Sequence, residues 1–278
     1  MDLSIIIITR NNKNILEECI DSLMKFTKGL SFEVIVSDNG SADGTQRSIR
    51  SKYPEIILIE NEKNLGFSGG NNKGLKTAKG RYSVLLNDDT YLKENAFSKI
   101  VQFMDDNPEI GICGPKLLNV NGSIQRQGSV LSSLKWRSKG PIEVDFVLGA
   151  CLFTRAAALE KIGYLDENLF FYNDDLDLCK RAKSAGYKVV YFPDAEIYHY
   201  GGYSSKKDPD KRFIIEGFRG GLYYCKKHYS PMIYQIYRAM ILLFMPIFAV
   251  FSLANRVKRS AYLDIFTIAL KQQIVHRS

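Results

Sequence analysis

Short apolar runs alternate with amphipathic segments in the first third of the chain. The runs are rich in β-branched residues and too short for helices, which is typical of strands; they span residues 3–9, 32–36, 56–59 and 82–86. Between the first two runs, apolar residues recur at helical spacing from Ile15 to Met24, with Asn14 as the expected cap. This alternation predicts βαβ units and a mostly parallel sheet, so we expect an α/β fold.

Two further helices are expected in the same part of the chain. Ser41 or Asp43 is expected to cap the second of them. Residues 61–70 are predicted to form a glycine-containing loop. The third helix then carries Asn71 and ends at Gly80.

The pattern becomes less regular after residue 90. Helices are predicted at residues 96–104, 155–162, 174–185 and 213–229. A strand is predicted at 110–113, a buried segment at 146–153, and edge strands at 189–191 and 197–200. Residues 115–141 differ, because Asn121-Gly122 is a hairpin turn signal and the segment is rich in glycine and serine. We predict that this segment crosses the active-site face as a mobile loop.

An uncharged apolar run covers residues 239–254 and contains Pro246. It is shorter than the roughly 20 residues of a typical membrane-spanning helix. Basic residues flank it, so we favour a helix at an anionic membrane surface or a re-entrant helix. The alternatives are a helix packed on the domain and a homodimer interface. We therefore expect two parts, a domain at 1–230 and a helical tail at 231–278.

Composition and charge narrow the class of protein. The 278 residues are 45% hydrophobic, which fits one large α/β domain with an appendage. The net charge of +8 favours anionic partners such as nucleoside diphosphates or anionic lipid. No helix-turn-helix, zinc-finger or RNA-binding signature occurs, so nucleic acid is not an expected partner.

Cysteine usage and the N-terminus bear on location. The five cysteines include no CxxC pair, which predicts buried thiols in a reducing compartment. No cationic leader precedes the first predicted strand, so we expect no secretory signal. The expected location is cytoplasmic, peripheral on the cytoplasmic face of the membrane.

Two adjacent carboxylates, Asp88 and Asp89, come directly after the apolar run 82–86. Open α/β sheets bind ligands at the carboxyl ends of their parallel strands. Paired carboxylates there suit Mg²⁺ or Mn²⁺, ions that also bind substrate phosphates. A strand-ending turn is the alternative, because Asn and Asp form turns readily.

Four polar clusters resemble, in order, the motifs of the family 2 glycosyltransferases. The clusters contain Asp38, residues 64–74, residues 87–89 and residues 174–177. Members of that family have the GT-A fold, a Rossmann-like sheet flanked by helices that binds nucleotide sugars. The resemblance covers roughly residues 1–230 and is strongest to rhamnosyltransferase-type enzymes of bacterial surface polysaccharide assembly.

The resemblance implies a set of donor-binding residues. Asp38 would accept a hydrogen bond from the nucleobase, whereas its neighbours Asn39, Ser41 and Asp43 fit an Asx turn or a helix cap. Asn64, Gly69 and Asn71 match the family's nucleotide-side loop, with a tight capped loop as the alternative. Thr9, at the end of the first predicted strand, is placed with them as a nucleotide-sugar-binding residue.

The resemblance also implies a metal site. Asn87-Asp88-Asp89 matches the family's Asp-x-Asp motif, with Asn87 replacing the first acid. Asp89 is then the expected metal ligand, and Asp88 contacts the ribose. His199 is the second expected ligand, with a structural histidine as the alternative. Cations downstream of it could meet phosphates or be solvated: Lys206, Lys207 and Arg212.

Acidic residues at a helix start match the family's catalytic pair. Asp175 takes the position of the general base, and Asp174 that of a donor-binding acid. Asp177 is expected only to complement the helix dipole, which should also lower the pKa of Asp175. Trp136 and Arg137, in the predicted mobile segment, are candidate acceptor contacts. The small residues 149–151 resemble the family's segment beneath the donor sugar, with a plain core strand as the alternative.

The expected function is therefore that of a metal-dependent inverting glycosyltransferase. By resemblance, the donor is a dTDP- or UDP-linked sugar, with L-rhamnose as the first choice, and the acceptor is a growing or lipid-linked glycan. A nucleotidyltransferase is one alternative, but it should carry a basic glycine-rich loop where this chain has residues 10–13. A non-catalytic sugar- or membrane-binding scaffold of the same fold is the other.

Overall fold

The computed structural model describes residues 1–125, 135–202 and 211–275. Residue contacts divide the chain into two compact units, which we describe separately. The first unit consists of residues 1–65, 69–165 and 175–201. The second consists of residues 66–68, 166–174 and 202–278, so it groups 211–230 with the C-terminal helices, whereas the sequence-based boundary at 230 placed them with the sheet.

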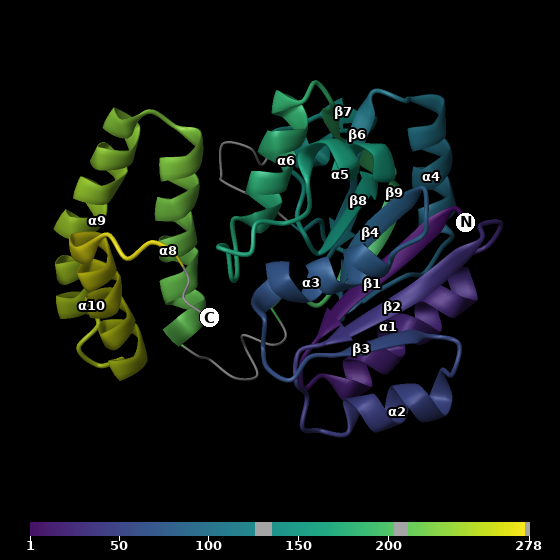
Figure 1. Cartoon of the computed structure of the whole chain (residues 1–278), viewed down its shortest axis with the longest axis horizontal. Helices are drawn as coiled ribbons and strands as arrows, with labels where there is room; N and C mark the ends of the chain where they lie inside the picture. The colour runs from purple at the N-terminus through teal and green to yellow at the C-terminus, as the bar shows by residue number, and fades with distance from the viewer. Residues whose placement is uncertain (126–134, 203–210, 276–278) are drawn as a thin grey trace. The chain divides into compact units, whose positions relative to one another are not determined.

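One sheet organises the first unit, in the order β3-β2-β1-β4-β8-β6-β9-β5, with β7 paired to β9 (Figure 1). Its strands are β1 Leu3–Thr9, β2 Phe32–Asp38, β3 Ile57–Glu60, β4 Tyr82–Asn87, β5 Thr90–Tyr91, β6 Ile110–Leu118, β7 Ile142–Glu143, β8 Cys151–Arg155 and β9 Lys188–His199. The first four strands in this order run parallel, as predicted. Strand β8 runs antiparallel to both β4 and β6 and joins the two halves of the sheet.

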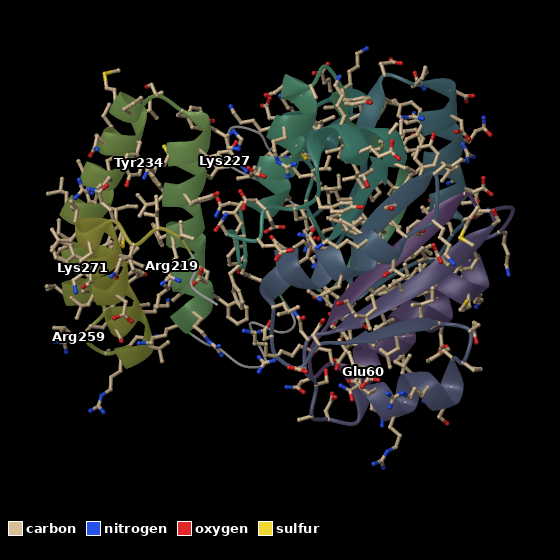
Figure 2. The ribbon with its side chains drawn as sticks, viewed as in Figure 1. Glu60, Arg219, Lys227, Tyr234, Arg259 and Lys271 are labelled. Carbon is tan, nitrogen blue, oxygen red and sulfur yellow. The ribbon has the colours of Figure 1, made fainter. Side chains whose placement is uncertain are left out.

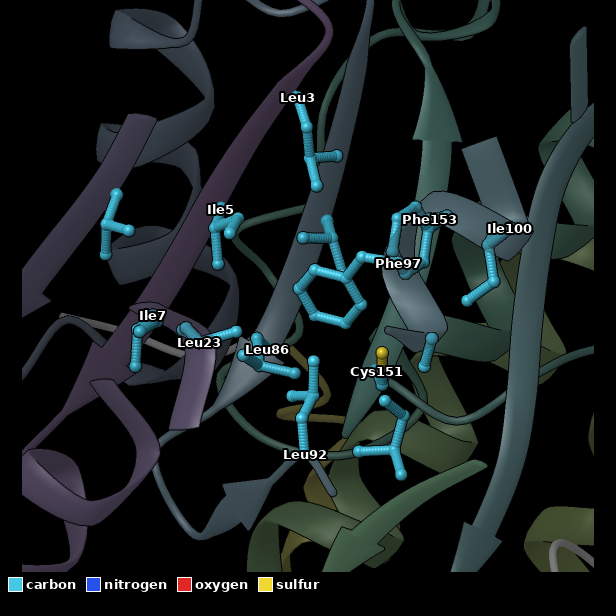
Figure 3. Packing of buried hydrophobic residues seen from close by; sticks show 14 of the residues in the cluster. Leu3, Ile5, Ile7, Leu23, Leu86, Leu92, Phe97, Ile100, Cys151 and Phe153 are labelled. Atoms are coloured by element: carbon cyan, nitrogen blue, oxygen red, sulfur yellow. The ribbon is translucent and has the colours of Figure 1, made fainter. Parts of the chain in front are cut away.

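Helices cover both faces of the sheet. They are α1 Lys13–Phe26, α2 Thr45–Lys52, α3 Gly66–Thr77, α4 Ala96–Asp106, α5 Ala156–Ile162 and α6 Asp174–Ser184, together with the 3₁₀ turn η2 Lys135–Arg137. Alternate side chains of β1 point to opposite faces. Ile5 and Ile7 pack in a core with Leu23 of α1 and Phe97 of α4 (Figure 3).

The other face of β1 explains the glycines of α3. A Cβ atom on Gly74 would lie 2.5 Å from Ile6 Cγ2, and one on Gly70 would lie 2.4 Å from Ile8 Cδ1. The backbone of α3 therefore lies directly on the strand, which only glycine permits. The predicted loop at 61–70 is wrong in its second half, because α3 already begins at Gly66.

Other details of the sequence prediction also need correction. Asn14 lies inside α1, whose N-cap is Asn12. The two predicted edge strands at 189–191 and 197–200 are one strand, β9, which pairs with β6 on one side and with β5 and β7 on the other. Its register against β6 shifts between Pro115 and Lys116, which lets the strand continue past its polar interruption. The expectation of buried thiols is confirmed, since all five cysteines are free and buried.

In the part of the second unit that the structure describes after residue 202, three helices share a core of their own. They are α8 Lys211–His228, α9 Pro231–Phe251 and α10 Arg256–Lys271 (Figure 1). Leu222, Ile241, Met245 and Ile265 lie at the centre of this core. Residues 166–174 also belong to the second unit.

Asp166 ties that segment to α8. Its Oδ2 accepts hydrogen bonds from Tyr223 Oη at 2.9 Å and from Lys227 Nζ at 2.7 Å (Figure 2). Its Oδ1 accepts from the backbone N–H of Asn168 at 3.0 Å. Burial alone would raise the pKa of Asp166, but these bonds lower it from its ordinary value of 3.8 to about 2.

Asp166 should therefore contribute stability above pH 4 that is lost below it. A depressed folded-state pKa stabilises the protein fully above the unfolded-state pKa, and the contribution vanishes as the pH falls through the folded-state pKa. We expect Asp166→Asn to lower the free energy of unfolding by about 2 kcal/mol at pH 7, and this difference to shrink between pH 4 and pH 2. Urea denaturation across this range measures it.

Asp264→Asn is the matched control, because Asp264 pairs with Lys211 through side chains that are 45% and 44% exposed. This variant should stay within about 0.5 kcal/mol of the wild type. Equal losses in the two variants would contradict the role of Asp166.

Candidate active site

The parallel strands end at one edge of the sheet and bring polar side chains together there. Thr9 of β1 is in register with Asp38 of β2, and Ile8 is in register with Asn87 of β4. Because β4 ends at Asn87, the two acids that follow it leave the sheet at this edge. The structure thus gathers Thr9, Asp38 and the 87–89 motif at the carboxyl ends of the strands, as the sequence predicts.

Asp88 is buried and held by hydrogen bonds. Only 6% of the residue is exposed, and its Oδ2 accepts from Thr9 Oγ1 at 2.6 Å and from Asn12 Nδ2 at 3.1 Å. Burial and the neighbouring charge of Asp89 raise its pKa to about 7. The Thr9 hydroxyl is thus engaged with Asp88, which gives both residues a fixed place in the site. Sequence reasoning missed Asn12.

Asp89 faces His199 of β9. The Oδ1 atom of Asp89 lies 3.0 Å from His199 Nε2, and Asn87 Nδ2 lies 3.3 Å from the same nitrogen. On the other side of the ring, Nδ1 lies 2.7 Å from Gln125 Oε1. Since that amide oxygen only accepts, the ring proton belongs on Nδ1, and the lone pair of a neutral His199 at Nε2 is directed to the Asp89 side. Asn87 Nδ2 donates to this lone pair, and a bound cation would take the place of that donor and join Nε2 to Asp89 Oδ1.

The donor set fits a divalent cation. A carboxylate oxygen and an imidazole nitrogen are both ligands of Mn²⁺, and adjacent ligands about 2.1 Å from an octahedral ion lie about 3 Å apart, the separation seen here. The described residues contain no group of three His, Cys, Asp or Glu side chains suited to a metal. Two protein ligands leave most positions to water and phosphate oxygens, the usual arrangement for an ion that binds together with a nucleotide.

Gln125 comes from the predicted excursion. The Asn121-Gly122 turn is confirmed, with Gly122 at φ 80° and an antiparallel bridge between Leu118 and Ile124. This hairpin brings Gln125 back beside β6, where the backbone N–H of Gln125 donates to the carbonyl of Leu117. The turn was the signal that could have located Gln125. Other parts of the excursion, including Gly128, Ser129, Ser132 and Ser133, lie outside the described residues.

Asp38 is buried and bonded within its own loop. Its Oδ2 accepts from the amide of Ser41 at 3.1 Å and from Gln46 Nε2 at 2.6 Å, and its Oδ1 accepts from Ser41 Oγ. Asp38 therefore also holds the turn that follows β2. Recognition of a nucleobase by Asp38 stays a prediction.

The other predicted nucleotide-side residues lie around the start of α3. Asn64 Oδ1 accepts from Asn39 Nδ2 at 3.1 Å, which connects the loop before α3 with the end of β2. Gly69 and Asn71 lie within α3 rather than in a loop, and Asn71 is fully buried. Their binding roles stay predictions.

Asp174 and Asp175 open α6 as predicted. Asp175 Oδ2 accepts from the amide of Gly149 at 3.2 Å, and Oδ1 accepts from the amide of Leu176 at 2.8 Å. Burial raises the pKa of Asp175. The expectation that the helix dipole would lower that pKa is wrong, because desolvation outweighs it. Gly149 belongs to residues 149–151, which resemble the family's segment beneath the donor sugar, and its backbone N–H binds Asp175.

Four further residues singled out in the sequence are Asp177, Trp136, Lys206 and Lys207. Asp177 forms an ion pair with Arg181, which also donates to the carbonyls of Ile162 and Tyr164, so both side chains brace the start of α6. Trp136 is 2% exposed and packs edge-on against Tyr191, so the idea that it contacts an acceptor is wrong. Lys206 and Lys207 lie outside the described residues.

Comparisons with known proteins agree with this geometry. A sequence profile described as "Glycosyl transferase family 2" matches residues 4–163. The chain is 26% identical over 211 residues to the N-acetylglucosaminyl-diphospho-decaprenol L-rhamnosyltransferase of Mycobacterium tuberculosis, covering 63% of this chain and 69% of that protein. It is 27% identical over 252 residues to the uncharacterised protein y4gI of Sinorhizobium fredii, covering 82% of this chain but only 27% of y4gI.

A solved structure shares the fold. The mannosyltransferase PcManGT of Pyrobaculum calidifontis, in complex with GDP-Man and Mn²⁺, superimposes with a TM-score of 0.61 at 15% identity. The match covers 98% of this chain and 87% of that one.

The geometry predicts that Asp89 and His199 bind Mn²⁺ together. In the presence of a nucleoside diphosphate, Asp89→Asn and His199→Ala should each weaken Mn²⁺ binding by tenfold or more, because each removes one of two protein ligands. Mn²⁺ titration followed by electron paramagnetic resonance measures the affinity. Tyr200→Phe is the control, since the hydroxyl of Tyr200 donates to Glu18 and not to this pair. Unchanged affinity in both ligand variants would rule the site out.

Proposed function

This chain belongs to glycosyl transferase family 2, and from that premise we propose that it transfers a sugar from a nucleoside-diphosphate sugar to a hydroxyl group of a cell-surface or lipid-linked glycan. The observation that carries the proposal is the 3.0 Å approach of Asp89 Oδ1 to His199 Nε2 at the carboxyl edge of the parallel strands. A carboxylate and an imidazole nitrogen at this separation suit a divalent cation that also binds a diphosphate.

The chemistry assigned to this chain is a single displacement. The acceptor oxygen attacks the anomeric carbon while the bond from that carbon to the diphosphate oxygen breaks, so the anomeric configuration inverts. Asp175 takes the proton that the acceptor hydroxyl loses. The raised pKa of Asp175 suits this task, because a base works best when its pKa approaches the working pH. The amides of Gly149 and Leu176 orient its two oxygens.

Asp89 and His199 would hold the cation, Mg²⁺ or Mn²⁺. When bound, it supplies positive charge to the diphosphate as that group leaves. Asp88, fixed by Thr9 and Asn12, completes the acidic edge beside the ribose. The binding of Mn²⁺ and GDP-Man by a mannosyltransferase of the same fold supports this assignment.

L-Rhamnose linked to dTDP or UDP is the donor we propose to test first. The support is the relative from Mycobacterium tuberculosis, whose name gives an L-rhamnosyltransferase acting on an N-acetylglucosaminyl-diphospho-decaprenol. An acceptor of that kind is embedded in a membrane, so the proposal includes a membrane surface as partner. A non-catalytic scaffold is disfavoured, because Asp38, Asp89 and Asp175 are all retained at positions that match the family's motifs.

The second unit offers a face for that membrane. Among the described residues, α9 is one helix long and apolar enough to cross a bilayer. One stripe of α9, with Ile241 and Met245, packs in the helical core, so the packing alternative holds for that stripe. Phe251, the last residue of α9, is 85% exposed, and Leu253, in the turn that follows, is 62% exposed. Exposed cations follow at once: Arg256, Lys258 and Arg259. Apolar and basic side chains together suit an anionic lipid surface, and we assign this end to the headgroup layer.

The base assignment predicts a large loss of rate in Asp175→Asn. We expect kcat to fall by about a thousandfold while the affinity for the nucleotide sugar stays within a fewfold of the wild type, because general base catalysis contributes roughly 10² to 10⁴. In the wild type, kcat should fall as the pH drops through a pKa above the ordinary aspartate value, since a protonated Asp175 accepts no proton. Steady-state kinetics across the pH range measure both. Asp194→Asn, at an exposed position, is the control, and full transfer by Asp175→Asn would show the base to be misassigned.

The membrane assignment predicts that Phe251→Glu with Leu253→Glu lowers binding to phosphatidylglycerol vesicles about tenfold, because apolar contact is lost and negative charge is added. Vesicle cosedimentation at low and high salt measures this. Val120→Glu, at another exposed apolar position of 51%, should bind as the wild type does. Unchanged binding by the double variant, or equal binding to phosphatidylcholine alone, would contradict the assignment.

A further inference from the structure

Residues 166–173 lie along one face of α8. Phe171 packs edge-on against Phe213, with ring centroids 5.0 Å apart. Asn173 Nδ2 donates to the carbonyl of Gly217 at 3.1 Å, and Asp166 accepts from Tyr223 and Lys227. The α8 positions that make these contacts are 213, 217, 220, 223 and 227. Steps of three and four residues keep them on one face of the helix, so the whole segment is held by a single stripe of α8.

Two residues at the end of this segment have unusual backbone angles. Tyr172 has φ 66° and Asn173 has φ 64°, both in the left-handed region. Asn enters that region readily, but a bulky tyrosine does so only when surrounding contacts impose it. Such strain persists where the structure over-determines it, and it tends to occur at functional sites. Asp174 and Asp175 follow this pair directly and begin α6.

Glycines in α8 make room for the strained pair. A Cβ atom on Gly220 would lie 2.9 Å from Asn173 Nδ2 and 3.3 Å from both the carbonyl oxygen of Tyr172 and Leu169 Cδ2. A Cβ atom on Gly217 would meet only Tyr172 Cδ2, at an ordinary 3.5 Å. The two glycines therefore differ, and only Gly220 is needed for close approach.

The segment is also held from the start of α3. The amide of Phe67 donates to the carbonyl of Phe170 at 2.7 Å, and Ser68 Oγ donates to the carbonyl of Leu169 at 2.6 Å. Gly66, at φ 74°, has no space for a side chain, because a Cβ atom there would lie 2.3 Å from the carbonyl oxygen of Phe170. The segment is thus held by α8 and by the residues that begin α3.

We propose that Asn173 and Gly220 are positioning residues for the general base. By holding residues 172 and 173 in a left-handed turn, they set the backbone direction at Asp174, the first residue of α6, and with it the orientation of Asp175, the next residue in the chain. The inference rests on the proposed function, since it concerns the orientation of the Asp175 carboxylate as general base. It assigns α8 a role in the rate of the reaction, apart from any role in stability or membrane binding.

The test compares Gly220→Ala with Gly217→Ala in the full-length protein, with Asn173→Gly as a second probe. Gly220→Ala displaces Asn173, whereas Gly217→Ala adds a methyl group at ordinary distance and keeps the carbonyl that Asn173 meets. Asn173→Gly keeps the left-handed turn but removes the hydrogen bond. We expect kcat to fall about tenfold in Gly220→Ala and Asn173→Gly, because small misplacements of reacting groups cost up to 10²-fold. The KM for the nucleotide sugar and the melting temperature should change little, and Gly217→Ala should match the wild type.

Each outcome has a defined meaning. Wild-type kcat in both Gly220→Ala and Asn173→Gly overturns the inference while the proposed function stands. Loss of kcat together with a raised KM and a lowered melting temperature also overturns it, because contact with α8 would then be purely structural. If the wild type itself transfers no sugar from any donor tested, the proposed function fails, and the inference fails with it.

Discussion

The burial of two consecutive carboxylates at the end of β4 is the constraint on which the rest of the site depends. Asp88 and Asp89 are 6% and 5% exposed, and like charges this close oppose one another. Thr9 and Asn12 stabilise Asp88 from the end of β1 and the start of α1, and His199 approaches Asp89 from β9. Both halves of the sheet must therefore be in place before this edge can form. The negative charge that remains at this edge would attract a cation, and that cation would in turn bind a diphosphate.

Much of the first half of the fold can be predicted from the sequence, because its strands are covered on both faces and are uniformly apolar. Other elements depend on contacts that the sequence does not show. The sequence predicts two strands in place of β9 because Pro193 and Asp194 interrupt its apolar pattern; in the structure one strand continues through them, with a register shift against β6. The sequence predicts a loop at the start of α3 because the reason for its glycines, close contact with Ile6 and Ile8, is tertiary.

In the site, too, the identity of the residues could be predicted, but their burial and exact position depend on the fold. The resemblance to the family 2 glycosyltransferases placed Thr9, Asp88, Asp89 and His199 in one site, and the structure brings them together. The pKa of Asp175 was predicted in the wrong direction because reasoning from a helix dipole leaves out burial, which depends on the whole fold. Gln125 was missed because its place follows from the hairpin that returns it to β6.

The most direct test of the central claim, cation-assisted transfer from a nucleotide sugar, is a donor panel assayed with and without chelator. The protein is incubated with Mn²⁺, a lipid-linked glycan acceptor and one of several dTDP-, UDP- and GDP-sugars, and the released nucleotide and the anomeric configuration of the product are measured by NMR. The account predicts that one donor yields a nucleoside diphosphate and an inverted glycoside, and that EDTA abolishes both. Consumption of no donor, transfer that persists unchanged in EDTA, or release of pyrophosphate instead of a nucleoside diphosphate would contradict it.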